Sequence, residues 1–294
     1  MNPIKNPKFQ ELKSKLPSDW SQATELQKRT MTALVGASAL ILLFSLGRQF
    51  GVALFAAILS LALLWEFVEI AFELEDKHEK RWTLLAFSWF VSFVSYLAPE
   101  FQFIGLIGVF LALFIYFLIT ARRHHGPAFQ KHLQELIYAV FAFLYLGILP
   151  GFLPMLARSS GGMHWVFVFL LINWAGDIGA YFAGKKYGKN KLYPEISPKK
   201  TWEGAAGGLA SSVGIVLLYK WVFFPELSFI SALLVPLLVA PVAQIGDLCE
   251  SFIKRAFGKK DSGGILPGHG GFLDRFDGVV FSLPLMYACV RILG

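Results

Sequence analysis

Long apolar segments recur along the chain from residue 31 onward, and they constrain its fold more than any other feature. Hydrophobic residues make up 55% of the 294 residues and charged residues only 16%, a balance unlike that of a water-soluble globular protein. A helix needs about 20 mostly apolar residues to cross a bilayer. The sequence therefore predicts an all-α polytopic membrane protein with about nine transmembrane helices, at 31–47, 50–72, 82–98, 101–120, 133–157, 163–183, 205–224, 227–246 and 277–293.

Basic residues predict the orientation of these helices, because the cytoplasmic loops of membrane proteins are enriched in Lys and Arg. If the N-terminus is cytoplasmic and the C-terminus lies outside, 23 of the 27 Lys and Arg residues fall on the cytoplasmic side. Such loops beside an anionic membrane surface account for the net charge of +7 without a nucleic-acid partner. The predicted inside segments are 1–30, 73–81, 121–132, 184–204 and 247–276.

Residues 1–30 are polar and form a predicted cytoplasmic segment. They lack the short apolar core and the cleavage site of a signal peptide. Residues 8–30 could lie along the membrane surface as an interfacial helix, which Pro17 would interrupt. The compact length and the absence of a transit peptide favour a bacterial cytoplasmic membrane over an organellar one.

The polar residues divide the membrane region into two unlike parts. Residues 31–157 form five predicted spans with polar side chains near their ends, which favours a lipid-facing scaffold. Glu66 and Glu69 stand near the end of the second span, and we expect them at the membrane interface. Residues 158–294 form four spans with charged loops, and polar residues enter these spans from Asn173 onward. We therefore expect the catalytic domain in the second part.

The first polar group of the second part is a helix face. Asn173, Asp177, Tyr181 and Gly184 follow one another at intervals of four, four and three residues, so they share one side of a helix. A carboxylate within a span is costly unless it faces protein, water or an ion. Asp177 is therefore either a site residue or a structural carboxylate that bonds to Asn or Tyr of a neighbouring helix.

The second polar group, Ser-Pro-Lys-Lys-Thr-Trp-Glu-Gly at 197–204, precedes the seventh predicted span. Lys199 and Lys200 beside a helix N-terminus favour an anion site, because the helix dipole and free backbone N–H groups add to their charge. The hydroxyl groups of Ser197 and Thr201 complete the predicted phosphate site. The alternatives are a helix cap, with Glu203 close enough to help, and lysines that contact anionic lipids.

The third polar group runs from the end of the eighth predicted span to the start of the ninth. Asp247 and Asp274, at two helix ends, would clamp a divalent ion without His or Cys. Lys and Arg neutralise phosphate oxygens, and the many glycines let backbone N–H groups approach them. We therefore predict a phosphate and Mg2+ site with the further members Glu250, Lys254, Arg255, Lys260, Asp261, His269, Arg275 and Asp277.

The roles within this third group differ. We assign Lys254, Arg255 and Lys260 to phosphates, and Arg275 either to a phosphate or to the orientation of an Asp. Glu250 and Asp277 are additional candidates for the metal. His269 is either a substrate contact or a surface histidine of the glycine-rich loop.

Residues 251–277 resemble the signature of the phosphatidate cytidylyltransferases, also called CDP-diacylglycerol synthases. The matching pattern is Ser-x-Ile-Lys-Arg-x4-Lys-Asp-x-Gly-x2-Leu-Pro-x-His-Gly-Gly-Phe-x-Asp-Arg-Phe-Asp. The segment around Asp177 and the 197–204 block are also similar to stretches of that family, whereas the N-terminal half is similar only in having several spans. The resemblance implies Mg2+-dependent transfer of CMP from CTP to phosphatidic acid, which yields CDP-diacylglycerol and pyrophosphate. It also implies a second, monovalent cation, K+.

The resemblance further implies roles for individual carboxylates. Asp247 and Asp274 fall on the positions that hold the metals in the family, and Asp177 and Asp261 match other acidic positions. The lipid phosphate would attack the CTP α-phosphorus in line, and neutralising charges would supply much of the rate. Phosphatidic acid comes from the bilayer and CTP from the cytoplasm, so we expect a polar funnel open to both on the cytoplasmic side. The sequence is compatible with a homodimer as well as with a monomer.

Other classes of protein share parts of this pattern. A CTP-dependent polyprenol or lipid-alcohol kinase would release CDP, whereas CMP transfer releases pyrophosphate. A transporter or channel could use Asp177 and a broken, glycine-rich segment as an ion path. Against transport, the chain shows no internal repeat and its polar groups gather at one membrane face. A purely structural scaffold gives no reason for the charges of 251–277.

Overall fold

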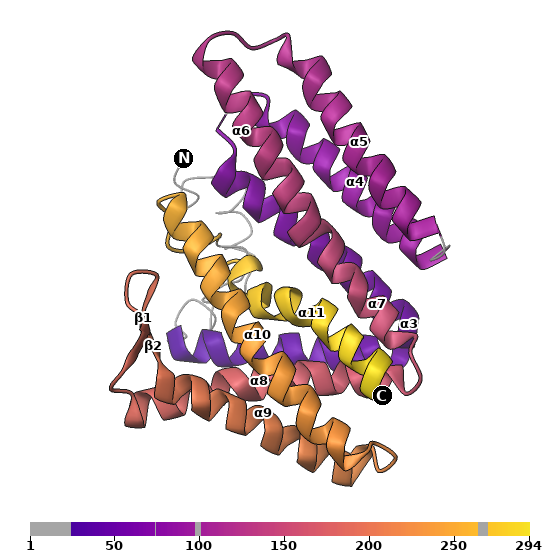
Figure 1. Cartoon of the computed structure of the whole chain (residues 1–294), viewed down its shortest axis with the longest axis vertical. Coiled ribbons are helices and arrows are strands. Elements are labelled where there is room, and N and C mark those ends of the chain that lie inside the picture. Colours follow the sequence, from indigo (N-terminus) through magenta and orange to yellow (C-terminus); the bar gives the residue numbers. More distant parts are fainter. Residues whose placement is uncertain (1–24, 74, 98–100, 264–269) are drawn as a thin grey trace, which may run out of the picture.

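Helices form nearly all of the regular structure, as the sequence predicts. The computed structural model describes residues 25–73, 75–97, 101–263 and 270–294, and Figure 1 shows their arrangement. The helices are α3 (Glu25–Ala71), α4 (Lys77–Leu97), α5 (Gln102–Ala121), α6 (Pro127–Ala142), η3 (Phe143–Ile148), η4 (Leu149–Gly151), α7 (Phe152–Ala157), α8 (Gly162–Tyr187), α9 (Trp202–Phe223), α10 (Phe229–Ala256) and α11 (Leu273–Leu293).

Seven helical segments of the described chain are long and apolar enough to cross a membrane, so the chain is an integral membrane protein. The sequence predicts nine spans; each falls largely on helical residues, and the span 133–157 runs through α6, η3, η4 and α7. The seven segments are Val35–Ala71, Ile104–Ala121, Pro127–Ala157, Gly162–Tyr187, Trp202–Phe223, Phe229–Ala256 and Leu273–Leu293.

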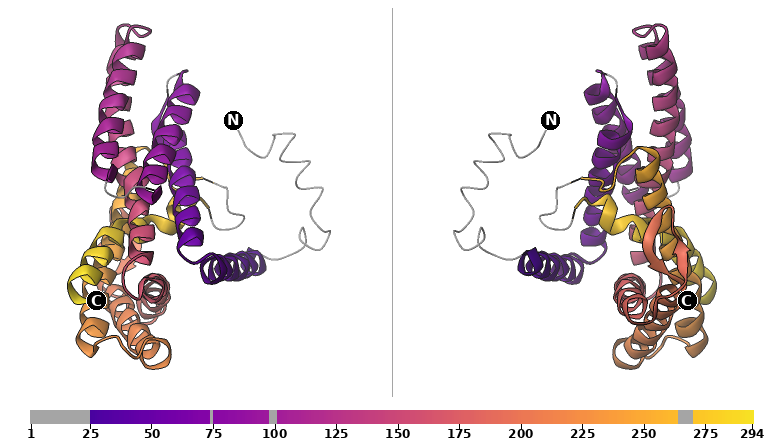
Figure 2. Two further views of the ribbon diagram at one scale, coloured as in Figure 1. Left: turned by 90° about the vertical axis from the view of Figure 1, so that its right-hand side faces the viewer. Right: turned by 90° about the vertical axis from the view of Figure 1, so that its left-hand side faces the viewer.

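Two features explain the difference between seven and nine. The predicted spans 31–47 and 50–72 both belong to α3, whose backbone turns at Arg48 (φ 46°, ψ −132°). Figure 2 shows the part of α3 before this kink lying crosswise to the part after it. The predicted span 82–98 falls on α4, which begins with charged residues at 77–81 that lower its hydropathy. The orientation of the two termini stays a prediction.

Ion pairs join two segments that the predicted topology assigns to the same membrane side. Arg123 lies 2.7 Å from Glu79, and Lys131 lies 2.7 Å from Glu73. The α3–α4 and α5–α6 connections therefore lie at one end of the bundle. This arrangement agrees with the shared side predicted for 73–81 and 121–132.

Two clusters of buried apolar side chains hold the helices together. One includes Trp165 of α8 and Phe44 of α3, and the other includes Phe67 of α3 and Phe143 of the π-helical segment η3. Burial of each such side chain contributes about 1.5–3 kcal/mol. α11 packs into both clusters, so the packing of the helices crosses the predicted division at residue 157.

Small residues let α8 and α9 approach each other closely. A Cβ added to Gly207 of α9 would come within 2.2 Å of the Cβ of Ala183. A Cβ added to Gly179 of α8 would come within 2.0 Å of Ser211 Oγ. Close contacts between small residues are a common way for helices to pack in membranes. They fix the position of α8, the helix that carries Asp177.

A short hairpin between α8 and α9 corrects the all-helical prediction locally. Its strands β1 (Lys191–Tyr193) and β2 (Ser197–Thr201) pair in antiparallel fashion, as Figure 1 shows. Thr201 ends β2 and caps α9, because its Oγ1 accepts a hydrogen bond from the Gly204 N–H at 3.1 Å. The helix cap, an alternative that the sequence leaves open for this block, is therefore present, and β2 places Lys199 and Lys200 beside the N-terminus of α9.

Candidate active site

The three polar groups of the sequence meet around one cavity of about 510 Å³. Its walls come from α8, β1, β2, α9, α10 and α11, which are consecutive elements of the second half of the chain. Carboxylates and cationic side chains face each other across this cavity. The charged lining residues are Asp177, Lys185, Lys199, Lys200, Asp247, Asp274, Arg275 and Asp277.

The α8 wall contains the helix face that the sequence predicts. All four residues of that face, at positions 173, 177, 181 and 184, line the cavity, as expected for residues that follow the helical repeat. Asp177 is close enough to Asp247, Lys200 and Arg275 to interact with them electrostatically. This placement among the other charged groups favours a site residue over a purely structural carboxylate.

An ion pair links β2 to α10 at the cavity. Lys200 Nζ lies 2.5 Å from Asp247 Oδ2, and the two side chains are 26% and 39% exposed. The Lys200 ammonium is itself buried against this carboxylate, whereas the Asp247 side chain stays partly accessible. Lys199 also lines the cavity and is exposed. Both lysines line the cavity, and Lys200 neutralises Asp247.

Asp274 stands in the first turn of α11 and is held by three donors. Lys254 Nζ lies 2.5 Å from Asp274 Oδ1. The backbone N–H groups of Gly271 and Ser262 donate to Oδ2 at 2.9 and 3.0 Å. Lys254 also lies 2.7 Å from Glu250, a residue that is only 1% exposed. This chain of alternating charges orients Asp274, and Lys254 itself is not among the lining residues.

Several predicted site residues lie away from the cavity walls. Arg255 is exposed, and its Nη1 donates to the carbonyl of Lys259 at 3.2 Å. Lys260 and Asp261 are exposed, and Ser197 opens β2 without lining the cavity. The predicted substrate contact His269 lies outside the described residues.

The oxygen donors of the cavity fit a hard cation. Asp177, Asp247, Asp274 and Asp277 all contribute carboxylates, and the described lining includes no His or Cys. A set of oxygen donors suits Mg2+, whereas His and Cys donors suit zinc. Asp247 is paired with a partly exposed lysine, while three donors already hold Asp274. Asp247 therefore has fewer competing partners than Asp274 and is the more available of the two predicted Mg2+ ligands.

Glu66 supports the site, although the sequence predicts it at the membrane interface. The residue is 2% exposed, and its carboxylate accepts hydrogen bonds from Phe272 N at 2.9 Å and Leu273 N at 2.8 Å. Ser262 Oγ donates to it at 3.1 Å. A carboxylate in this place also meets the positive end of a helix. Glu66 thus fastens the start of α11, directly before Asp274, to α3.

We expect Glu66→Gln to loosen the attachment of α11 to α3. Glutamine keeps the size of the side chain but replaces one acceptor oxygen by an NH2 group, and a buried donor left without an acceptor costs about 1–3 kcal/mol. Hydrogen exchange of the Phe272 and Leu273 amides should become faster. Glu75→Gln, at an exposed position, is the control. Unchanged exchange at both amides would contradict this role of Glu66.

Comparison with known proteins supports the family resemblance of the signature. A sequence model of the Cytidylyltransferase family matches residues 27–293. The chain is 41% identical over 155 residues to the phosphatidate cytidylyltransferase of Bacillus subtilis (strain 168), and 46% identical over 155 residues to that of Staphylococcus haemolyticus (strain JCSC1435). Each alignment covers 52% of this chain and 58% of the relative, so the chain spans little more than half the length of these relatives. Because the family match extends over almost all of its length, the chain belongs to the cytidylyltransferase family.

Proposed function

We propose that this protein transfers CMP from CTP to phosphatidic acid and thereby forms CDP-diacylglycerol and pyrophosphate for phospholipid synthesis. The observation that carries the proposal is the cavity in which carboxylates and lysines meet at the ends of apolar helices. Relatives named phosphatidate cytidylyltransferase, 41% and 46% identical over their matched parts, support the same activity. Joining a nucleotide to a lipid phosphate requires such a concentration of charge beside the lipid.

The reaction brings two anions together, so charge must be neutralised first. A phosphate oxygen of the lipid attacks the α-phosphorus of CTP. The bond from this phosphorus to the oxygen that bridges to the β-phosphate breaks, and pyrophosphate leaves with the electron pair. Lys199, Lys200 and Arg275 line the cavity and would bind phosphate oxygens. A phosphate monoester has a second pKa of about 6, so no general base is required near neutral pH.

Mg2+ and K+ are part of the proposal. Asp247 and Asp274 would hold Mg2+, and Asp177 and Asp277 are the further lining carboxylates that could hold a second cation. When bound, Mg2+ would neutralise oxygens of the transferred and the departing phosphates. Lys200 pairs with Asp247 and would be available to a phosphate once Mg2+ occupied this carboxylate. Lys254 would position Asp274 rather than bind substrate.

The exposed side of α8 supports a lateral route of the lipid to the site. Tyr181 lines the cavity and is 62% exposed, and the nearby Ile178 and Phe182 are 59% and 64% exposed. Exposed apolar residues of a spanning helix face lipid. Phosphatidic acid would therefore enter from the side along α8, while CTP would enter from the cytoplasm. We place the protein in a bacterial cytoplasmic membrane with this site on the cytoplasmic side.

The activity is tested with purified protein in detergent, phosphatidic acid, Mg2+, K+ and radiolabelled CTP. Label in the lipid phase with an equal amount of pyrophosphate in water is the expected result. Release of CDP with a phosphorylated lipid alcohol would indicate a kinase instead. Cation-dependent uptake into proteoliposomes, unaffected by Asp274→Asn, would indicate a transporter. No incorporation by folded protein would overturn the proposal.

Lys200→Ala is expected to raise the KM for CTP or for phosphatidic acid by about 10–100-fold. A hydrogen bond to a charged group contributes about 1.5–3 kcal/mol, and each 1.4 kcal/mol corresponds to a factor of ten. The measurement is the initial rate of CMP transfer with each substrate varied in turn. Lys191→Ala, which removes an exposed lysine from the other strand of the same hairpin, should leave both KM values unchanged. The phosphate role of Lys200 is wrong if its own replacement also leaves both unchanged.

A further inference from the structure

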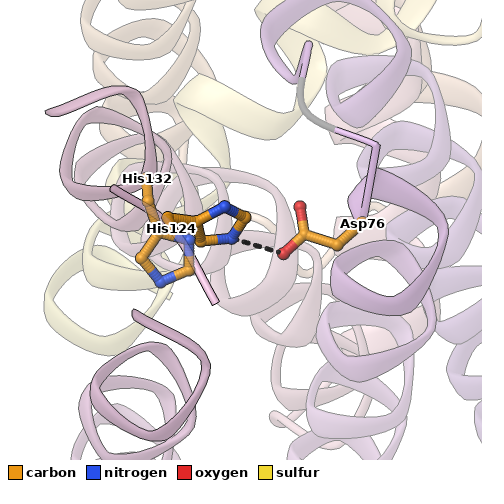
Figure 3. A group of neighbouring side chains, drawn as sticks. All are labelled: Asp76, His124 and His132. Atoms are coloured by element: carbon orange, nitrogen blue, oxygen red, sulfur yellow. Dashed lines mark hydrogen bonds and ion pairs between the residues drawn. The ribbon is translucent and has the colours of Figure 1, made fainter. Parts of the chain in front are cut away.

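Three side chains with metal-binding atoms meet near the connections that join α3 to α4 and α5 to α6. Asp76 comes from the turn before α4, His124 from the turn after α5, and His132 from α6. One donor atom of each lies within 4.8 Å of the others. Figure 3 shows the His124 ring between the His132 ring and the Asp76 carboxylate. None of the three residues lines the cavity of the candidate active site, so this group is separate from the proposed function.

The hydrogen bonds of His132 leave one ring nitrogen available. Its Nε2 lies 2.8 Å from the carbonyl oxygen of Phe117, and because a carbonyl only accepts, this nitrogen carries the proton. The other nitrogen, Nδ1, then has a free lone pair. The residue is 3% exposed, and Nδ1 has no hydrogen-bond partner among the described residues. Buried polar atoms in native proteins nearly always have a partner, so this one requires an explanation.

The second observation is that a histidine held in this way matches a metal ligand. Metal-bound histidines usually donate their other ring N–H to a backbone carbonyl or a carboxylate, which fixes the tautomer and the ring orientation. The Phe117 carbonyl has this position relative to His132. The ring also packs against the Phe117 ring, with 5.0 Å between the centroids, and against the His124 ring at 4.5 Å. His132 is thus oriented before any ion binds.

Asp76 supplies a negative charge to the group. Its Oδ1 lies 2.7 Å from Lys80 Nζ, and its Oδ2 lies 3.1 Å from His124 Nε2. Both oxygens of the carboxylate thus face a cation or an N–H donor. Lys80 also lies 2.6 Å from Glu135, so one ammonium group faces two carboxylates and the local charge favours a cation.

We propose that Asp76, His124 and His132 bind Zn2+, with His132 contributing its Nδ1 and water as the fourth ligand. Two imidazole nitrogens and a carboxylate oxygen suit zinc, whereas Mg2+ and Ca2+ prefer oxygen alone. Ligand atoms about 2.1 Å from a tetrahedral ion lie about 3.4 Å from one another. The donors lie within 4.8 Å of one another, so the ion would draw them closer, and the His124 nitrogen that now donates to Asp76 would release its proton on binding. The ion would tie the α3–α4 turn to the α5–α6 turn.

The test uses the full chain, purified with a tag that contains no histidine and stripped of metal with a chelator. Zn2+ is titrated by calorimetry with Mg2+ in excess, which occupies the carboxylates of the cavity. Wild-type protein should bind one Zn2+ per chain, and bound Co2+ should give the visible absorption of a tetrahedral site. His124→Asn and His132→Ala should weaken Zn2+ binding by at least about 100-fold, the upper range for loss of a supporting group alone.

His125→Ala is the matched control, because it removes an exposed histidine at the next position and should bind Zn2+ as the wild type does. Zn2+ should also raise the melting temperature of the wild type and of this control, since an ion that binds only the folded state stabilises it. If His132→Ala does not fold because the residue is buried, the Zn2+ affinity of His124→Asn alone tests the proposal. The proposal is overturned if the wild type binds no Zn2+ saturably, or if His124→Asn binds it as tightly as His125→Ala does.

Discussion

Asp247→Asn is expected to lower kcat for CMP transfer by about 10²–10³-fold, the effect that loss of one charge-stabilising group has at other active sites. Asparagine keeps the shape of the side chain but removes the charge that would hold Mg2+ in the cavity. Asp247 is 39% exposed, and the amide oxygen of asparagine can still face the buried ammonium group of Lys200. The variant should therefore fold normally. The measurement is the rate of label incorporation into lipid over a range of Mg2+ concentrations.

Glu195→Gln is the control for this variant, because it removes an exposed carboxylate from the turn of the neighbouring hairpin. It should keep the wild-type rate, and both variants should melt at the wild-type temperature in detergent. Partial recovery of the rate of CMP transfer by Asp247→Asn at high Mg2+ would support a metal-binding role of Asp247. If Asp247→Asn keeps the wild-type rate of CMP transfer, Asp247 does not belong to the metal site. If Glu195→Gln loses as much activity as Asp247→Asn, the loss is a general effect of removing a negative charge.

The walls of the cavity could be predicted separately because each follows from local periodicity. Asp177 and its neighbours on α8, and Asp247 and Glu250 on α10, stand at helical spacings within apolar sequence. A polar face of a spanning helix has to be covered by protein, water or ions. Which faces meet depends on packing that the periodicity does not contain. The close approach of α8 and α9 at Gly179 and Gly207 is one such determinant.

Glu66 shows what such patterns leave out. A carboxylate near the end of a predicted span resembles an interfacial residue, and nothing adjacent in the sequence indicates otherwise. Its partners are two backbone N–H groups and the Ser262 hydroxyl, all about 200 residues away. Backbone donors have no residue type that a sequence pattern could reveal. Their contact with Glu66 can be found only once α3 and α11 are placed side by side.

The number of spans and the presence of the hairpin could not be predicted fully, because both depend on the local conformation of the backbone. Arg48 lies between the predicted spans 31–47 and 50–72 and bends α3 with a positive φ that is uncommon for residues other than glycine, so the predicted break is a kink within one helix. The strands β1 and β2 have three and five residues, which is too short for an alternating pattern to stand out. Thr201 was identifiable as a helix cap because capping depends on one residue and its immediate neighbours.

Lys254→Met is expected to lower the free energy of unfolding by about 3–5 kcal/mol, which is the usual cost of removing one partner of a buried ion pair. Lys254 Nζ lies between Glu250 and Asp274, at 2.7 and 2.5 Å. Without the ammonium group, two carboxylates would face each other in a largely buried place. The measurement is unfolding in detergent followed by tryptophan fluorescence. Lys259→Met, which removes an exposed lysine just beyond α10, is the control.

The double variant Lys254→Met with Glu250→Gln separates a positioning role of Lys254 from a phosphate-binding role. Removal of the second charge should restore most of the lost stability, because Asp274 keeps its bonds to the backbone N–H groups of Gly271 and Ser262. CMP transfer should stay low in both variants, since the carboxylate of Asp274 loses the cation that orients it. If Lys254 instead binds substrate phosphate, Lys254→Met should melt normally and raise a KM, and that result would refute the positioning role.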